Sequence, residues 1–325
     1  MPPTNAVAPA FPNVFPGVPT GFTLATQDIT TVSPDFATLY SANANVSLSR
    51  DLGHNAGFTA TYLYTTGNRL PIWRNINLIA GPNSLADGRP IFGTSRIDTR
   101  FNNILSAESV GKSNYNGLNL RFDKRFSRGL DAFASWTWSH AIDDAPEQNN
   151  IDSGAAALSD PSNRRRDRGN SLTDRRHAFN ANLVWNTSSA AANRALQYLA
   201  SNNRIALLFN AQSGENFNLG GNRILNGDNT AGTAFQRPLF VGRNTLRAPA
   251  TSELNLRYSR IFPIKERWKP EFFFESTNIF NHTNVTGINS TASVDTLGAI
   301  TTPASLAWTS ALDQRLVQFG LKLTF

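Results

Sequence analysis

Hydrophobic and polar residues alternate at every second position over long stretches of this chain. In the first such stretch, residues 40–49, the intervening positions are all serine or asparagine. A repeat of two places successive side chains on opposite faces of a β-strand, so the stretch predicts a strand with one apolar and one polar face. Its apolar or aromatic positions are Tyr40, Ala42, Ala44, Val46 and Leu48.

The same alternation returns along the rest of the chain and predicts an all-β protein with about nine strands. With their flanks the strands reach roughly 9 to 13 residues, which exceeds the usual length in globular sheets and suits a tilted strand that crosses a bilayer. Asn, Thr, Ser, Arg and Glu on the alternate face suit a water-filled lumen. The alternating segments lie at 40–49, 56–65, 118–126, 130–138, 179–185, 205–211, 254–262, 272–275 and 317–325.

The connections between these segments are short at one end and long at the other. Outer-membrane barrels have short periplasmic turns and long external loops, whereas a compact soluble domain rarely holds several long loops. The pattern therefore favours a transmembrane antiparallel β-barrel. Short connections are expected at 51–55, 127–129 and 263–269, a moderate one at 187–202, and long ones at 67–112, 142–176, 214–251 and 281–314.

Composition removes most enzyme classes. The 325 residues include no Cys and only four His, which excludes thiolate metal sites and leaves little for acid-base chemistry. We expect neither an enzyme nor a cofactor. The net charge of +7 does not indicate a nucleic-acid partner, because no Lys or Arg precedes Arg50 and the densest basic run lies in a predicted loop. The longest apolar run, 205–209, is too short for a spanning helix.

Several segments resemble the TonB-dependent outer-membrane receptors, and specifically their Oar-like branch with large barrels. Their order and spacing carry the resemblance over about two thirds of the chain. It implies a barrel of about 22 strands whose lumen holds an N-terminal plug, and energy-coupled uptake of a large nutrient across the bacterial outer membrane. The matching segments are GKSNYNGLNLRF at 111–122, WTWSHAIDD at 136–144, DRRH at 174–177, FESTNIFNH at 274–282 and LKLTF at 321–325.

We expect the chain to correspond to only part of such a receptor. Nine strands that begin and end in the same direction cannot close an antiparallel barrel, so we expect residues 38–325 to form the C-terminal part of a larger one. The proline-rich residues 1–37 are expected to be the remnant of an external loop. No signal peptide, plug or energy-coupling box is recognised, so contact with the TonB system is expected only through a plug outside the sequence.

Two other functions stay open at this point. One is a soluble or surface-attached β-rich binding or adhesion module, which exposed aromatics in register on one face would contradict. The other is a small passive porin, which needs a further strand within residues 1–37. Pro12, Pro16 and Pro19 oppose that strand because proline removes a donor from the ladder.

Two groups of residues are candidate sites. The resemblance implies that the barrel-assembly machinery recognises the C-terminal strand, through Val317, Phe319, Leu321, Leu323 and Phe325. Clustered arginines near a membrane favour anionic head groups, so Arg164, Arg165, Arg166 and Arg168 are candidate contacts to outer-membrane lipid and glycolipid. Two further clusters are predicted to be solvated or paired strand ends, not metal or anion sites: His140, Asp143 and Asp144, and Asp174, Arg175, Arg176 and His177.

Overall fold

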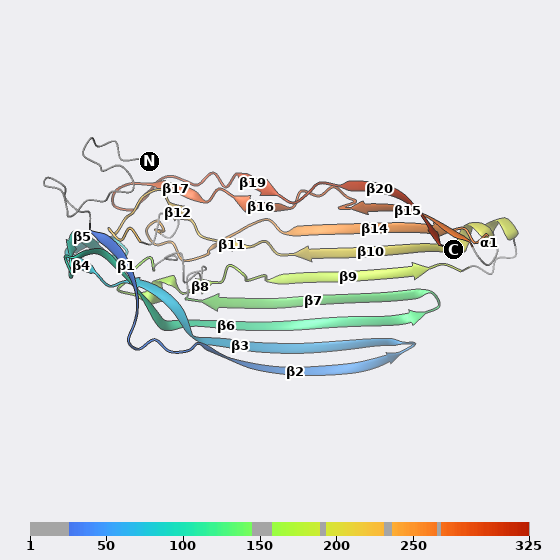
Figure 1. The fold of residues 1–325 in the computed structure, drawn as a ribbon, viewed down its shortest axis with the longest axis horizontal. Coiled ribbons are helices and arrows are strands. Elements are labelled where there is room, and N and C mark those ends of the chain that lie inside the picture. Colours follow the sequence, from blue (N-terminus) through green and yellow to red (C-terminus); the bar gives the residue numbers. More distant parts are fainter. Residues whose placement is uncertain (1–25, 145–157, 189–192, 231–235, 265–267, 325) are drawn as a thin grey trace, which may run out of the picture.

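One large antiparallel sheet dominates the computed structural model, which describes residues 26–144, 158–188, 193–230, 236–264 and 268–324 (Figure 1). Nine strands follow one another across this sheet in chain order, and all nine predicted strands are confirmed. They are β2 (Tyr40–Gly53), β3 (Ala56–Asn75), β6 (Phe101–Ser127), β7 (Leu130–Asp143), β9 (His177–Asn186), β10 (Asn203–Gln212), β14 (Thr251–Ile261), β15 (Lys269–Thr277) and β20 (Leu316–Thr324).

The register of the ladders keeps the two faces of the sheet continuous. Because the side-chain period is two, a slip by one residue would mix apolar and polar positions on each face. No such slip occurs over the central part of the sheet. One apolar row runs through Val46, Tyr62, Leu118 and Trp138, and the adjacent polar row runs through Ser47, Thr61, Asn119 and Thr137.

The apolar face of the sheet is open to its surroundings. Val46, Leu48 and Leu321 are each 75% exposed, and Phe319 is 68% exposed. A contiguous apolar face of this extent does not fit a soluble module and needs lipid or a partner to cover it. Most of the described apolar side chains that are buried lie instead at the loop end of the strands, among them Leu78, Leu85, Phe92, Leu158, Leu225, Val285, Ala292 and Val294.

Tight turns join the strands at the end of the sheet where β2 meets β3. Arg128 and Gly129 both have positive φ, 50° and 82°, in the turn between β6 and β7. A Cβ on Gly129 would lie 2.2 Å from the carbonyl oxygen of Asn186, so this position requires glycine. The longer connection from β9 to β10 holds the helix α1 (Arg194–Ala200), whose N-terminus is capped by the side chain of Asn193.

At the opposite end the long connections fold on one another (Figure 1). We call residues 76–100, 158–176, 213–230, 236–250 and 278–315 the loop cap. Its pairs of short strands are β4 (Leu78–Ser84) with β5 (Pro90–Arg96), β11 (Asn216–Phe217) with β13 (Leu246–Arg247), β16 (Val285–Ile288) with β19 (Trp308–Ala311), and β17 (Thr291–Val294) with β12 (Gly220–Gly221) and β18 (Ile300–Thr302). It also holds the 3-10 turn η1 (Arg164–Asp167) and β8 (Gly169–Asn170), which pairs with β7.

The prediction of a long loop at 67–112 is wrong at both boundaries, because strand structure extends into this range from each side. β3 continues to Asn75 and β6 begins at Phe101, so the two strands pair well beyond the predicted segments. The ladder shifts register between Asn68 and Pro71, where Arg69 has a φ of 57°. This irregularity breaks the alternation in the sequence while the pairing continues on its far side.

Both edges of the sheet are open as far as the described strands show. β2 and β20 each pair on one side only within the described residues, and both run from the loop cap towards the tight turns. Of the predicted loop remnant, residues 26–37 are described, and β1 (Gln27–Val32) within them pairs in parallel with β6 and not with β2. The strand that a self-closing porin needs is therefore not present in residues 26–37. The domain boundary at residue 37 stays a prediction.

Candidate functional site

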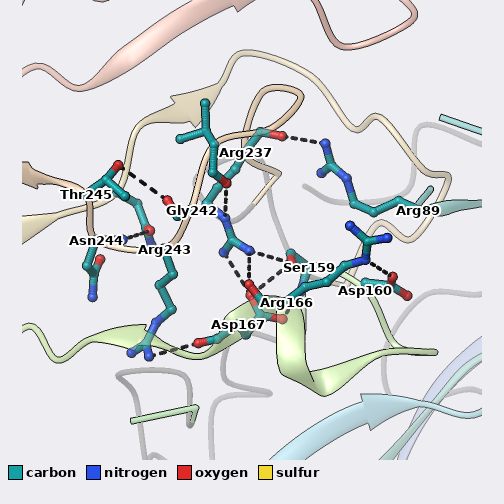
Figure 2. A network of polar contacts seen from close by, with 12 residues as sticks. Arg89, Ser159, Asp160, Arg166, Asp167, Arg237, Gly242, Arg243, Asn244 and Thr245 are labelled. Atoms are coloured by element: carbon teal, nitrogen blue, oxygen red, sulfur yellow. Dashed lines mark hydrogen bonds and ion pairs between the residues drawn. The ribbon is translucent and has the colours of Figure 1, made fainter. Parts of the chain in front are cut away.

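A buried arginine holds two segments of the loop cap together (Figure 2). Arg237 donates to Asp167 Oδ1 at 2.8 Å, to Ser159 Oγ at 3.0 Å and to the carbonyl oxygen of Arg166 at 2.9 Å. The side chains of Arg237 and Asp167 are only 5% and 8% exposed. Burial of a charge pair is unfavourable unless its donors are satisfied, and here the guanidinium finds several acceptors.

Two more buried arginines extend this network to the sheet and to the β4–β5 hairpin. Arg243 forms an ion pair with Asp143 at the end of β7 and donates to the carbonyl oxygen of Asp167 at 3.2 Å. Arg89 donates to the carbonyl oxygen of Arg237 at 2.8 Å. Burial lowers the pKa of Arg89, although the adjacent Asp87 carboxylate acts in the other direction. These contacts fix the loop cap to the strands.

Asp174 connects strands and loops at the foot of the cap. Its buried carboxylate accepts from the backbone N–H of Ala141 at 2.7 Å and from Asn216 Nδ2 at 3.1 Å, and it lies 3.4 Å from His140 Nδ1. Arg176 and Arg247 lie 3.8 and 3.5 Å from it. The charges of the segment 174–177 are thus paired with one another and with neighbours, as the sequence predicted.

The arginine run lies in the cap on and beside η1, and three of its four side chains bond to the protein itself. Arg165 is exposed, and its backbone N–H is accepted by Asn163 Oδ1. The predicted contact of this run with glycolipid stays a prediction. Arg164 lies 3.4 Å from Asp144, Arg166 lies 2.9 Å from Asp160, and Arg168 donates to Asn114 Oδ1 at 2.9 Å.

The C-terminal strand β20 forms one edge of the sheet. The ring of Phe319 lies 6.2 Å from that of Phe272 and 5.4 Å from that of Phe274, on the apolar face. Phe325 lies outside the described residues. Recognition by the barrel-assembly machinery stays a prediction. The other predicted residues of this signal lie opposite β15, with Val317 beside Ser276, Leu321 beside Phe272 and Leu323 beside Pro270.

The polar face of the sheet carries a band of amide side chains. Asn119 on β6 donates to Ser135 Oγ and to Thr137 Oγ1, both at 2.8 Å. The band continues across the ladders, where Asn180 lies opposite Ser135 and then opposite Asn210. Alternation predicted the polar character of this face. The sequence could not show which amides are neighbours, because that depends on the register between strands.

Where this band meets the loop cap, the surface forms a hollow of about 310 Å³, here called the polar hollow. Asn180, Asn210, Gln212 and Glu253 contribute to its lining, and none of the four side chains makes a hydrogen bond or ion pair with a described residue. At its rim Asn284 accepts from the backbone N–H of Ser252 at 2.7 Å and donates to its carbonyl at 3.0 Å. Free amides and one carboxylate can hydrogen-bond a polar ligand.

Two features are not found among the described residues. No group of three or more His, Asp or Glu side chains is arranged to hold a metal ion. No helix in this part of the chain has the length and hydropathy that crossing a membrane requires.

The long two-faced strands, the tight turns at one end and the folded loops at the other define the wall of a membrane-spanning β-barrel. The sequence comparison agrees. The family described as outer membrane beta barrel domain matches residues 2–242 and 232–318, so the chain belongs to this family and is an outer-membrane protein. A comparison with curated protein sequences finds no match.

Among solved structures, the chain is similar to three bacterial outer-membrane proteins at low identity. The alignment with the outer membrane transporter YddB from Escherichia coli includes 92% of this chain and 34% of the transporter, at 12% identity and a TM-score of 0.46. For the FrpB iron transporter from Neisseria meningitidis, the alignment includes 91% of this chain and 33% of the transporter, at 12% identity and a TM-score of 0.46. For a mutant of the ferric enterobactin receptor PfeA from Pseudomonas aeruginosa, it includes 88% of this chain and 31% of the receptor, at 10% identity and a TM-score of 0.45. The chain thus spans about a third of the length of these proteins.

Proposed function

We propose that this chain is the C-terminal wall of a TonB-dependent transporter that takes up a large polar nutrient. The observation that carries the proposal is the open sheet of nine strands, apolar on one face and amide-rich on the other, with folded loops at one end. The resemblance of the segments at 111–122, 136–144 and 274–282 to TonB-dependent receptors supports the same conclusion. Energy coupling would act through a plug outside the sequence.

The direction of the edge strands supports a wall segment over a self-contained pore. β2 and β20 run in the same direction, so joining them directly would create a parallel pair. Membrane barrels use antiparallel ladders almost throughout. Two copies of the sheet with their loop caps on the same side of the membrane would also meet in parallel pairs. Antiparallel closure therefore needs an odd number of additional strands.

The polar hollow would supply a contact for the cargo. It lies on the polar face of the sheet beside the loop cap, and in a closed barrel this face would line the lumen through which a nutrient passes. Its amides would exchange hydrogen bonds with a polar ligand, and Glu253 would favour a ligand that carries hydrogen-bond donors or positive charge.

Deletion of the gene in its own host tests the proposal. We expect loss of both surface binding and uptake of the same nutrient, whereas deletion of the tonB gene should abolish uptake and leave binding intact. Purified outer membranes should also contain the chain in a heat-modifiable, detergent-resistant barrel. Uptake that persists without TonB would indicate a passive porin, and binding without any uptake would indicate an adhesin; either result would contradict the proposal.

A further inference from the structure

The loop cap encloses an oxygen-rich cluster around Asp228, separate from the arginine network. Asp228 is 0% exposed. Its Oδ1 accepts from Thr230 Oγ1 at 2.6 Å, from the Thr230 backbone N–H at 3.1 Å and from Asn75 Nδ2 at 3.4 Å. Its Oδ2 is buried and has no hydrogen-bond partner among the described residues. An unpartnered buried carboxylate oxygen is energetically costly and calls for a physical explanation.

A second orphan acceptor belongs to the same cluster. Gln236 is also 0% exposed, and no described residue donates a hydrogen bond to its Oε1. The amide of this side chain is close to Asp228, because Gln236 Nε2 donates to the carbonyl oxygen of Asp228 at 3.4 Å. Two buried oxygen atoms with free lone pairs therefore lie within one small part of the cap.

No described donor accounts for either oxygen. Burial raises the pKa of Asp228, because an ionised carboxylate in the interior is costly without a positive partner in contact with it. Arg96 acts on Asp228 only through its charge, because its guanidinium donates to Gly93, Ser95 and Asn102. A water molecule would hydrogen-bond to the carboxylate but would add no positive charge to that of Arg96.

We propose that this cluster is a calcium-type divalent cation site with Asp228 as its anionic ligand and Gln236 Oε1 as a neutral one. Hard cations prefer carboxylate, amide carbonyl, hydroxyl and backbone oxygens, which are the groups gathered here. Further oxygens within the cluster are the carbonyl of Asp228 and Thr230 Oγ1. A single carboxylate fits the weak class of extracellular calcium sites, with dissociation constants on the order of 10⁻⁴ to 10⁻³ M.

The cation would connect the cap to the strands that carry it. Asn75 at the end of β3 reaches the cluster and also donates to Asn103 Oδ1 at 2.9 Å at the start of β6. Asn103 Nδ2 in turn donates to Asp28 Oδ2 on β1 at 3.1 Å. Neutralising Asp228 therefore stabilises a junction between three strands and the cap residues 226–230 and Gln236, and the order of the cap depends on divalent ions.

Binding of the metal alone tests the site. The full chain, in outer membranes or purified from them in detergent, is stripped with a chelator and titrated with CaCl₂, with terbium luminescence as a second readout. We expect one site in the affinity range given above, and Asp228→Asn should weaken binding at least tenfold. Asp295→Asn is the matched control, because Asp295 is half-buried in the same cap and accepts from the backbone N–H groups of Leu297 and Ala299, both at 2.9 Å.

A gain-of-binding variant keeps the test independent of folding defects. Gln236→Glu adds a second carboxylate, so it should bind calcium at least tenfold more tightly and make protection of the cap from protease more strongly calcium-dependent. Calcium binding that Asp228→Asn leaves unchanged would overturn the proposal. So would a Gln236→Glu variant with no gain in affinity, or an intact cap that shows no binding at millimolar calcium.

Discussion

Arg237 on one segment of the loop cap donates to Asp167 on another across 2.8 Å, with both side chains nearly excluded from solvent. The segments are 70 residues apart in the chain, so this pair fixes a long-range contact. Because water does not screen the pair, removal of one partner leaves an uncompensated charge in the interior. The cap is for this reason a folded unit and not a set of independent loops.

Substitution of Arg237 by Ala should open the cap without unfolding the sheet. Removing one partner of a buried pair costs about 3–5 kcal/mol, because the remaining charge is left uncompensated in the interior. Limited proteolysis and hydrogen exchange should show strong loss of protection in 158–170 and 236–245, with β9, β10 and β14 unchanged. Arg100→Ala is the control, since the Arg100–Asp98 pair is exposed. Equal protection in Arg237→Ala and Arg100→Ala would contradict the role of Arg237 in holding the cap together.

Adjacent leucines on β10 test which face of the sheet meets lipid. Leu207 lies between Leu183 and Leu256 on the apolar face. Leu208, one residue on, lies between Asn182 and Asn255 on the polar face.

Lysine at position 207 should cost about 2–4 kcal/mol if that position lies near the middle of the bilayer, and barrel assembly should fail. The same change at position 208 places the charge in the lumen and should be nearly neutral. The readout is the heat-modifiable fraction in outer membranes. A larger loss of the heat-modifiable fraction with lysine at position 208 than at position 207 would mean that the polar face, and not the apolar face, meets lipid.

The two faces could be predicted from the sequence because strand periodicity is a local property. Each strand keeps its apolar set on one side whatever its neighbours are, so Leu118 and Leu120 identify a strand without knowledge of Trp138. The extension of β3 to Asn75 was missed because a positive φ at Arg69 and the accompanying register shift break the local pattern.

The cap and the polar hollow could not be predicted, because they depend on contacts between distant segments. Leu85, Leu225 and Val294 form one small core although they come from three different connections. Likewise Asn180, Asn210 and Glu253 meet only through the registers of β9, β10 and β14. Individually, each of these residues is an ordinary member of a loop or of a polar strand face.

The polar hollow should determine affinity for the cargo. Replacing Asn210 with Leu removes an amide that has no partner in the described structure, so the barrel should assemble normally. A ligand group left without its hydrogen bond costs about 1–3 kcal/mol, so binding of the nutrient should weaken roughly tenfold. Surface binding to whole cells measures this.

Gln318→Leu is the control for Asn210→Leu, because Gln318 lies on the same face but is bonded to Glu275 at 2.7 Å and does not line the hollow. A loss of nutrient binding in this control as large as that in Asn210→Leu would show that the hollow is not the site of contact.

Acidity should stabilise the loop cap when divalent ions are removed. Burial raises the pKa of Asp228 above its ordinary value of 3.8, so the folded cap retains a proton at pH values where the unfolded chain has released it. The contribution of Asp228 to the stability of the cap is therefore largest below pH 3.8, falls as the pH rises through the window up to the raised pKa, and is constant above it.

The measurement is hydrogen exchange of the 226–230 and 236–245 segments at a series of pH values in chelator. Asp228→Asn carries no titrating group there and should remove this part of the pH dependence. Saturating calcium should also flatten it, because the cation competes with the proton for the same carboxylate. If Asp228→Asn changes the pH profile but calcium does not, burial alone, and not a bound cation, controls the protonation of this carboxyl group.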